Sequence, residues 1–255
     1  MSLAKRHNIL SRLAQNAKEL LADGYYSNQY PTANLPSLRK MINSQFVVMG
    51  EIKPGSPSQG RMYHSTKVET KIDQICQVVD GISVLTEPNY FFGSLDTVNQ
   101  VLEFNRPVLM KDFIIDIQQI KATPASVILL IKSLLDEEQI NDLTEYAHSA
   151  GKEVILEVDN EQDFIKQLDG CQDILAINNR NLATMKVDVN KATELVENYQ
   201  PEIPILGFSG YKTIEQIVEA AEHGVGGVLI GTVLSKSKDP AEFNARIRTA
   251  MGVMQ

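Results

Sequence analysis

Eight short apolar runs recur along the chain, and amphipathic stretches separate them. Most of the runs are continuous rather than alternating, which is typical of parallel strands buried on both faces. The segments between them carry apolar residues at helical spacing, as at positions 68, 72, 75 and 79. We therefore predict eight strands, at residues 46–51, 81–86, 107–111, 126–131, 153–158, 173–178, 203–208 and 227–231.

Strands that alternate with helices in this number, within 255 residues, are the pattern of a closed (β/α)8 TIM barrel. A doubly wound open sheet is the alternative, but such a sheet usually has fewer strands and a glycine-rich nucleotide fingerprint. The nearest glycine cluster, Gly224-Val225-Gly226-Gly227, does not match that fingerprint, and it precedes a strand instead of following one. The sequence therefore favours an α/β fold of the barrel type.

The first 45 residues precede the first predicted strand and form an N-terminal helical extension. Apolar residues from Leu10 to Leu21 lie on one helical face, and Gly24 is a plausible end of that helix. Residues 24–36 are rich in Tyr, Asn and Pro and predict an irregular connector, and residues 38–42 predict a short second helix. Because no linker divides the chain, we expect residues 1–255 to form a single domain.

The composition excludes several classes of protein. The net charge is −8 and no block of Lys or Arg is present, which argues against nucleic acid and anionic membrane surfaces as partners. The two cysteines lack metal-site or CxxC spacing, the histidines fall in helical or loop segments, and nothing resembles a metal site. No apolar run reaches membrane-span length, and the polar start lacks a signal-peptide core. We expect a cytoplasmic protein, and the sequence leaves open whether it is a monomer or a homodimer.

Charged and amide side chains follow four of the predicted strands at their carboxyl ends, where barrel enzymes place their active sites. On one strand, side chains two residues apart point to the same side, so Glu51 and Lys53 would share one space. Partly desolvated lysines can act as proton donors or nucleophiles, and carboxylates beside them can accept protons. The set that would converge on one barrel mouth is Glu51, Lys53, Lys111, Glu157, Asn178 and Arg180.

Small residues follow the last two predicted strands, as Ser209-Gly210 and Gly231-Thr232. They leave backbone N–H groups accessible, and barrel enzymes often bind phosphate at this place. The sequence therefore predicts an anion site next to the charged side chains.

These motifs resemble those of the indole-3-glycerol-phosphate synthase family. The resemblance runs in order from Glu51 to Gly231, and the motifs of the first, third and sixth strands are the most specific. The segments that carry it are Glu51-Ile52-Lys53, Ser56-Pro57-Ser58, Ser83-Val84-Leu85-Thr86, Tyr90-Phe91, Gly93-Ser94, Val108-Leu109-Met110-Lys111-Asp112-Phe113-Ile114, Ile128-Leu129-Leu130-Ile131, Leu156-Glu157-Val158, Ile177-Asn178-Asn179-Arg180-Asn181-Leu182, Ser209-Gly210 and Leu229-Ile230-Gly231.

The resemblance implies a cofactor-free lyase of tryptophan biosynthesis. Such an enzyme closes the pyrrole ring of 1-(2-carboxyphenylamino)-1-deoxyribulose 5-phosphate and releases CO₂ and water. By similarity, Lys111 is the general acid, Lys53 holds the substrate carboxylate, and Glu157 is the base that assists dehydration. Glu51 supports the lysines, and Asn178 and Arg180 orient the substrate. The resemblance also assigns Phe91, Phe113, Leu130 and Leu182 to the aromatic ring, and Ser56, Ser209, Gly210, Gly231 and Thr232 to the phosphate.

One departure from the family pattern is serious, and smaller ones occur at Pro54-Gly55, at Tyr211 and in residues 61–66. The family usually has Glu-Ser-Gly after the seventh strand, and this chain has Phe208-Ser209-Gly210. Phe208 therefore keeps open an alternative, a weakly active or inactive paralogue that binds a phosphorylated, anthranilate-like ligand. A phosphosugar isomerase of the same barrel type, such as phosphoribosylanthranilate isomerase, fits less well, because that family ends its first strand in Cys whereas this strand ends in Glu51 and Lys53.

Overall fold

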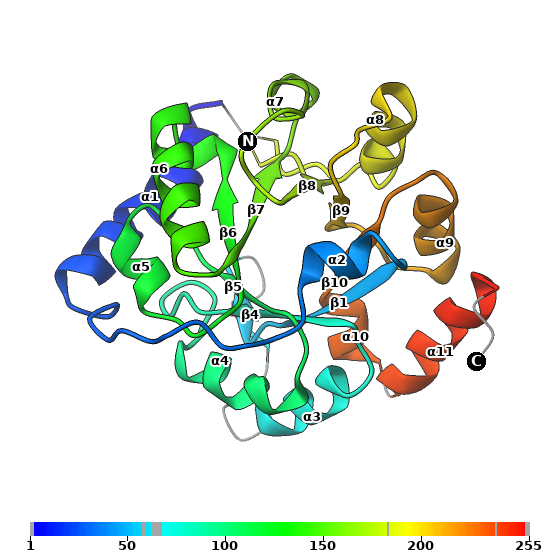
Figure 1. Ribbon diagram of the computed structural model, residues 1–255, viewed down its shortest axis with the longest axis horizontal. Helices are drawn as coiled ribbons and strands as arrows, with labels where there is room; N and C mark the ends of the chain where they lie inside the picture. The colour runs from blue at the N-terminus through cyan, green and yellow to red at the C-terminus, as the bar shows by residue number, and fades with distance from the viewer. Residues whose placement is uncertain (1–2, 58–59, 63–67, 183, 238, 253–255) are drawn as a thin grey trace.

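Eight parallel strands form a closed barrel in the computed structural model (Figure 1). The structure describes residues 3–57, 60–62, 68–182, 184–237 and 239–252. Around the barrel the strand order is β1-β10-β9-β8-β7-β6-β5-β4, and β4 closes on β1. The bounds are β1 Val47–Ile52, β4 Gly81–Leu85, β5 Val108–Lys111, β6 Val127–Ile131, β7 Glu153–Val158, β8 Ile174–Asn178, β9 Ile205–Phe208 and β10 Gly227–Ile230.

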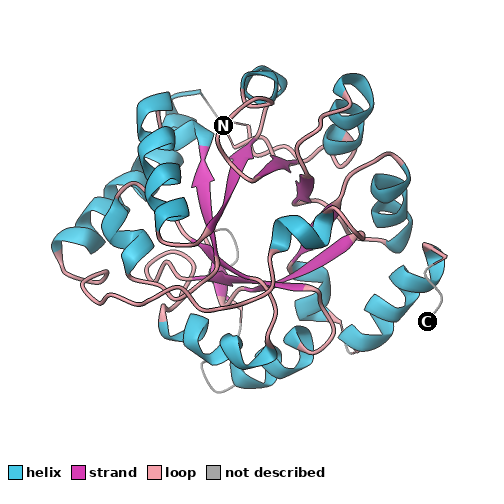
Figure 2. Cartoon of the chain, viewed as in Figure 1, coloured by secondary structure: helices cyan, strands magenta, loops and turns pink. Residues whose placement is uncertain are grey.

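Helices surround the barrel, as Figure 2 shows by the cyan elements outside the magenta strands. Two of them precede the barrel, α1 (Leu3–Ala22) and α2 (Leu38–Ile42). The others are α3 Val68–Cys76, α4 Asp96–Val101, α5 Ile117–Lys121, α6 Glu137–Ser149, α7 Glu161–Lys166, α8 Lys191–Tyr199, α9 Ile214–Glu222, α10 Thr232–Lys236 and α11 Pro240–Ala250. Among the described residues, the 3₁₀ helices Leu102–Phe104 and Lys132–Leu134 follow α4 and β6.

The alternation of side chains along each strand divides the core into two layers. In β1, Val48 and Ile52 pack outward against the helices, whereas Val47 and Met49 pack inside the barrel. Because both faces are buried, the strands read as continuous apolar runs. All eight predicted strands are therefore confirmed, with ends that differ by at most two residues.

The short helix α2 covers the amino-terminal end of the barrel. Leu38 and Ile42 belong to the inner apolar cluster, although they lie outside the barrel strands. The carboxylate of Glu153, at the start of β7, accepts hydrogen bonds from the Ser37 hydroxyl and from the backbone N–H of Leu38 at 2.8 Å. These contacts fix α2 across that end, so the opposite end alone remains for a binding site.

The loop after β1 contains a small antiparallel pair, β2 (Gly55–Ser56) and β3 (Gly60–Arg61), which the sequence pattern did not predict. Each strand has two residues, too few for a recognisable apolar alternation. Among the helices that the structure describes, none has both the length and the apolar character needed to cross a membrane.

Candidate active site

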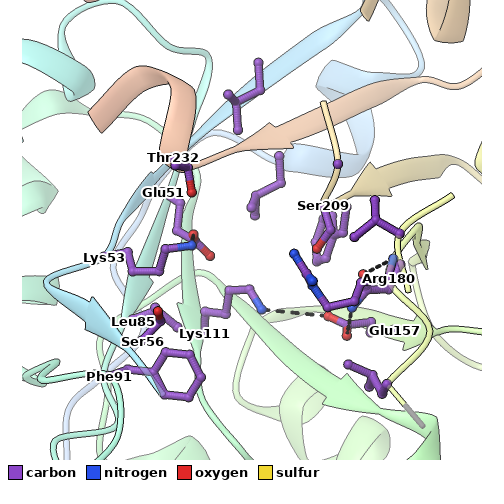
Figure 3. Close-up of a pocket in the computed structure, with 18 of the residues that line it drawn as sticks. Glu51, Lys53, Ser56, Leu85, Phe91, Lys111, Glu157, Arg180, Ser209 and Thr232 are labelled. Carbon is purple, nitrogen blue, oxygen red and sulfur yellow. Dashed lines mark hydrogen bonds and ion pairs between the residues drawn. The ribbon is translucent and has the colours of Figure 1, made fainter. Parts of the chain in front are cut away.

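A cavity of about 1010 Å³ opens at the carboxyl ends of the barrel strands (Figure 3). All six charged and amide residues predicted from the strand ends line it. The sequence pattern therefore located this cavity, because the carboxyl ends of all eight parallel strands meet at the same end of a barrel.

Glu51 and Lys53 extend from the end of β1 to the same side, and Figure 3 shows them adjacent. The Lys53 ammonium lies 2.6 Å from Oε2 of Glu51. Burial alone would raise the pKa of Glu51, but the nearby charges of Lys53 and Lys111 outweigh it and lower that pKa below its ordinary value. Glu51 is therefore a carboxylate at neutral pH, and it holds Lys53 at the cavity wall.

Lys111 reaches across the cavity toward Glu157 at the end of β7. Its Nζ lies 3.8 Å from Oε2 of Glu157 (Figure 3). Asn178 donates a hydrogen bond from Nδ2 to the other oxygen, Oε1, at 2.8 Å. Oε2 is buried and has no hydrogen-bond partner among the described residues. The carboxylate is thus fixed by one oxygen and offers the other toward the lysine.

Arg180 stands at the rim, on the loop that follows β8. Its backbone N–H donates to Oδ1 of Asn178 at 2.9 Å, so one amide side chain orients both Glu157 and this loop. Arg180 also pairs with Val187 across the loop. The guanidinium therefore projects from a braced segment and lines the cavity.

Phe208 occupies the end of β9 and points into the barrel mouth with only 1% of its surface exposed. Its neighbours in register are Asn178 on β8 and Leu229 on β10. The Lys111 ammonium lies 5.7 Å from the centre of the ring, within the range of a cation–π contact. A buried aromatic face thus lies beside Lys111, at the position where the resemblance led us to expect a carboxylate.

Aromatic and aliphatic side chains form one wall of the cavity. The rings of Phe91 and Phe113 are 5.7 Å apart and tilted by 39°, and Leu182 lines the cavity with them. Leu130 does not. It packs in the outer layer against the helices, and the next residue, Ile131, lines the cavity instead. The assignment of Leu130 was wrong because adjacent residues on a strand face opposite sides.

The residues expected to bind phosphate gather at the same mouth, between the loops after β1, β9 and β10. Ser209 and Gly210 both have positive φ, at 64° and 94°, and Asn179 donates from Nδ2 to the Ser209 carbonyl at 3.0 Å. At Gly231 a Cβ would lie 2.4 Å from Oε2 of Glu51, so only glycine lets that carboxylate approach the strand end. The cavity is lined here by Ser56, Ser209, Gly210, Gly231 and Thr232.

Sequence reasoning missed several residues of the cavity. Lys212 and Lys236 line it near the predicted phosphate position, and Leu10 and Leu13 of α1 reach it from the extension. The lysines follow the small-residue motifs closely in sequence, and that proximity was the available signal. The contribution of α1 to the cavity could not be predicted, because an amphipathic pattern shows that one face of a helix is buried but not which element it packs against.

Sequence reasoning also gave no role to Asp112, a buried carboxyl group next to Lys111. It accepts hydrogen bonds from the hydroxyls of Tyr26 at 3.0 Å and Thr86 at 2.5 Å, and from the N–H of Phe113 at 2.8 Å. Burial raises the pKa of Asp112 to about 6, and these hydrogen bonds limit the rise. Asp112 thereby ties the end of β5 to the N-terminal extension.

No cluster of metal-ligating side chains occurs among the residues that the structure describes. The donors and acceptors of the cavity are ammonium, guanidinium, carboxylate and amide groups, which suit proton transfer and anion binding.

Comparison with known proteins agrees with this geometry. Residues 3–247 match the family model described as indole-3-glycerol phosphate synthase. The indole-3-glycerol phosphate synthase of Leuconostoc mesenteroides is 34% identical over 236 residues, covering 89% of this chain and 90% of the relative. That of Exiguobacterium sibiricum is 34% identical over 252 residues, covering 92% and 95%.

Solved structures match in fold. The 3-hexulose-6-phosphate synthase of Salmonella typhimurium superposes with a TM-score of 0.64 at 17% identity, covering 82% of this chain and 100% of that one. A thiamine phosphate pyrophosphorylase of Pyrococcus furiosus gives a TM-score of 0.60 at 12% identity, covering 85% and 98%. The barrel fold is thus shared with these distant proteins. The match of the family model and of the relatives over nearly the whole length shows that this chain belongs to the indole-3-glycerol phosphate synthase family.

Proposed function

We propose that this protein converts 1-(2-carboxyphenylamino)-1-deoxyribulose 5-phosphate to indole-3-glycerol phosphate. A carbon–carbon bond forms between the ring carbon that carries the carboxylate and the ketone carbon of the sugar. CO₂ then leaves the ring carbon, and the former ketone oxygen leaves as water. The observation that carries the proposal is the pair of Lys111 and Glu157 facing one another in the cavity, 3.8 Å apart.

Lys111 is the general acid in this proposal. Protonation of the ketone oxygen makes its carbon electrophilic enough for attack by the aromatic ring, and an ammonium group is a suitable donor. The position of Lys111 between Glu157 and the Phe208 ring keeps its Nζ inside the cavity. Lys53, held by Glu51, binds the substrate carboxylate.

Glu157 is the base that removes the proton lost on dehydration. Its oxygen Oε2 is free of hydrogen bonds among the described residues, whereas Oε1 is held by Asn178. A carboxylate oriented through one oxygen can accept a proton at the other without rotating. Arg180, at the rim, adds a positive charge for the anionic substrate.

The two ends of the substrate require different surroundings, and the cavity supplies both. Phe91, Phe113 and Leu182 enclose the aromatic ring, together with Ile131. The phosphate lies against the loops after β1, β9 and β10, where backbone N–H groups, hydroxyls and the two nearby lysines, Lys212 and Lys236, can bind it. The substrate therefore spans the mouth with its reacting atoms between Lys111 and Glu157.

The matched relatives carry the name of the synthase, which favours turnover over the alternative of a ligand-binding paralogue. Glu51 lies near the end of β1 and Lys53 follows that strand directly, whereas the isomerase family is expected to have a Cys there. We therefore retain one function.

The test is an assay of the purified protein with the carboxyphenylamino-deoxyribulose phosphate. Because the chain has no Trp, indole emission from the product stands out from the protein's own fluorescence. We expect Lys111→Ala to lower kcat by about a hundredfold to ten-thousandfold, the contribution of a positioned general acid. Lys121→Ala, which removes a lysine packed on Tyr146 of α6, is the matched control and should leave the rate unchanged.

Absence of indole product with the parent protein would contradict the proposed function. Near-parental turnover of Lys111→Ala would leave the function standing and overturn the role given to Lys111.

A further inference from the structure

The carboxylate of Glu87, which immediately follows Thr86 after β4, is buried, and no charged partner for it occurs in the part of the chain that the structure describes. The side chain is 1% exposed, and no ion pair to it occurs among the described residues. Four hydrogen bonds surround it instead, three of them from consecutive backbone N–H groups. The donors are Asn89 N at 2.7 Å, Tyr90 N at 2.7 Å, Phe91 N at 2.9 Å and Nδ2 of Asn16 at 2.8 Å.

These bonds fold the loop after β4 tightly around the carboxylate. Gly93 donates its N–H to the Glu87 carbonyl at 2.9 Å, and Phe92 has a positive φ of 56°. A Cβ at Gly93 would lie 2.2 Å from the carbonyl oxygen of Leu85, so the loop lies directly on the strand end. The backbone of Phe91 is thus held at its N–H by a buried group, while its ring stands in the cavity wall (Figure 3).

Asn16 brings the fourth hydrogen bond from the middle of α1, 71 residues away in sequence. Its amide is used on both sides, because Oδ1 accepts from Nδ2 of Asn89 at 2.7 Å. Asn is a poor residue for a helix interior, and here it is 5% exposed on the face that meets the loop. Only a side chain that both donates and accepts fits between Glu87 and Asn89.

A further contact from α1 reaches the same loop. The guanidinium of Arg12 lies 5.6 Å from the centre of the Tyr90 ring, and its Nη2 is 3.4 Å from the Tyr90 hydroxyl. One helical turn before Asn16, Leu13 lines the cavity itself. Helix α1 therefore contacts the cavity directly and also through the loop that carries Phe91.

We propose that Asn16 and Glu87 are positioning residues that fix Phe91 against the aryl ring of the substrate. Through them α1 sets the affinity of the cavity for the aromatic end of the substrate, although neither residue touches the reacting atoms. The phenyl ring of Phe91 faces Phe113 at 5.7 Å, so a displaced loop opens the aromatic wall but leaves Lys111 and Glu157 in place. The inference rests on the proposed function for the identity of that ring.

The test is Asn16→Asp, which keeps the shape of the side chain and places a second carboxylate against Glu87. We expect KM to rise by about tenfold to a hundredfold, the value of a hydrogen bond to a charged group, with kcat changed less than about threefold. The matched control is Gln15→Glu, which adds the same charge to the neighbouring, exposed position of α1. A general loss of stability would lower kcat or the amount of folded enzyme and leave KM as it is.

A second variant restores the pair. In Asn16→Asp with Glu87→Gln, the new amide can donate to the new carboxylate, but its nitrogen gives up the hydrogen bond from the N–H of Asn89. We therefore expect KM to return part of the way to the parental value. Hydrogen–deuterium exchange of residues 88–93 should be faster in Asn16→Asp and unchanged in Gln15→Glu. Equal KM in the parent and Asn16→Asp would overturn the inference, as would equal exchange of this loop.

Failure of the proposed function is separated by a binding measurement. The substrate with its ketone reduced to an alcohol cannot cyclise, and calorimetry gives its dissociation constant without any turnover. If this ligand binds the parent protein at least about tenfold more tightly than Asn16→Asp, the inference stands whether or not indole forms. Equal dissociation constants would overturn it even in an active enzyme.

Discussion

Phe208 is the residue at which this active site departs from its family pattern. The ring is buried, and its centre lies 5.7 Å from the ammonium nitrogen of Lys111. A carboxylate at this position would form a second ion pair with Lys111. A cation–π contact of a partly desolvated ammonium is worth roughly 0.5–2 kcal/mol and accepts no proton. Among the described residues, Lys111 thus forms its ion pair with the carboxylate of Glu157.

We expect Phe208→Glu to raise kcat, because a carboxylate at this position forms a second ion pair with the Lys111 ammonium and orients it during ring closure. Steady-state kinetics of the parent and the variant measures the effect. Phe208→Gln, which has nearly the shape of the Glu variant without its charge, is the control and should not raise kcat. A Glu variant no faster than the parent would show that the ring is compensated elsewhere.

At the residue scale, the sequence predicted the strand-end groups because each belongs to a short local pattern. Glu51 with Lys53, and Asn178 with Arg180, are two residues apart at strand ends, and the spacing of an extended chain predicted that each pair would face one side. Leu130 was assigned to the cavity in place of its neighbour Ile131. A strand that is buried on both faces has no alternation of polar and apolar residues to show which side chains point into the barrel. Glu87 and Asn16 could not be paired, because 71 residues separate them and only the closed barrel brings them together.

The position of helix α2 depends on the side chain of Glu153. Five residues are too few for a stable isolated helix, so α2 depends on its contacts. Its first turn is held by Glu153, and Ile42 fills the space above Gly226, where a Cβ would lie 2.4 Å from its Cγ2. The polar contact orients the helix, and the apolar contact closes the barrel end.

We expect Glu153→Ala to lower the free energy of unfolding by about 1–3 kcal/mol, because it leaves the N–H groups at the start of α2 without their acceptor. Urea unfolding followed by circular dichroism measures the change. The kcat should be unchanged, since the active site lies at the other end of the barrel. Glu138→Ala, at an exposed position in the first turn of α6, should cost less than about 0.5 kcal/mol. Equal effects of the two variants would contradict the role given to Glu153.

Elements were predictable where they are long or apolar. The eight strands were found because every one of them is buried on both faces, and α3, α6 and α9 because their apolar residues keep helical spacing. The pair β2–β3 was missed because its four residues carry no apolar pattern. Local sequence thus defines the barrel, whereas the loops depend on contacts made across it.

For the whole molecule, the hydrogen bonds between the extension and the barrel argue against separate folding units. Tyr26 donates to Asp112, Tyr25 donates to the Thr86 carbonyl at 2.8 Å, and Asn16 donates to Glu87. The outer apolar cluster likewise includes Leu20 and residues of all eight barrel strands. We propose that residues 1–255 form one domain.

We therefore expect a single cooperative unfolding transition. Far-ultraviolet circular dichroism follows all helices and strands, and tyrosine emission reports on Tyr25 and Tyr26 among the eight tyrosines. The midpoints of the two probes in urea should coincide, as two-state unfolding requires. A tyrosine signal that changes well before the loss of secondary structure would show that the extension unfolds on its own.

The pairing of β1 with β10 has a consequence for the order of events during synthesis. Val47 lies opposite Gly227 in this pairing, so the first strand of the barrel waits for the last one to leave the ribosome. Until then β1 has one open edge, and no stable mouth exists at which Lys53, Lys111 and Glu157 could meet. The nascent chain is thus devoid of catalytic capacity until β10 has left the ribosome and paired with β1.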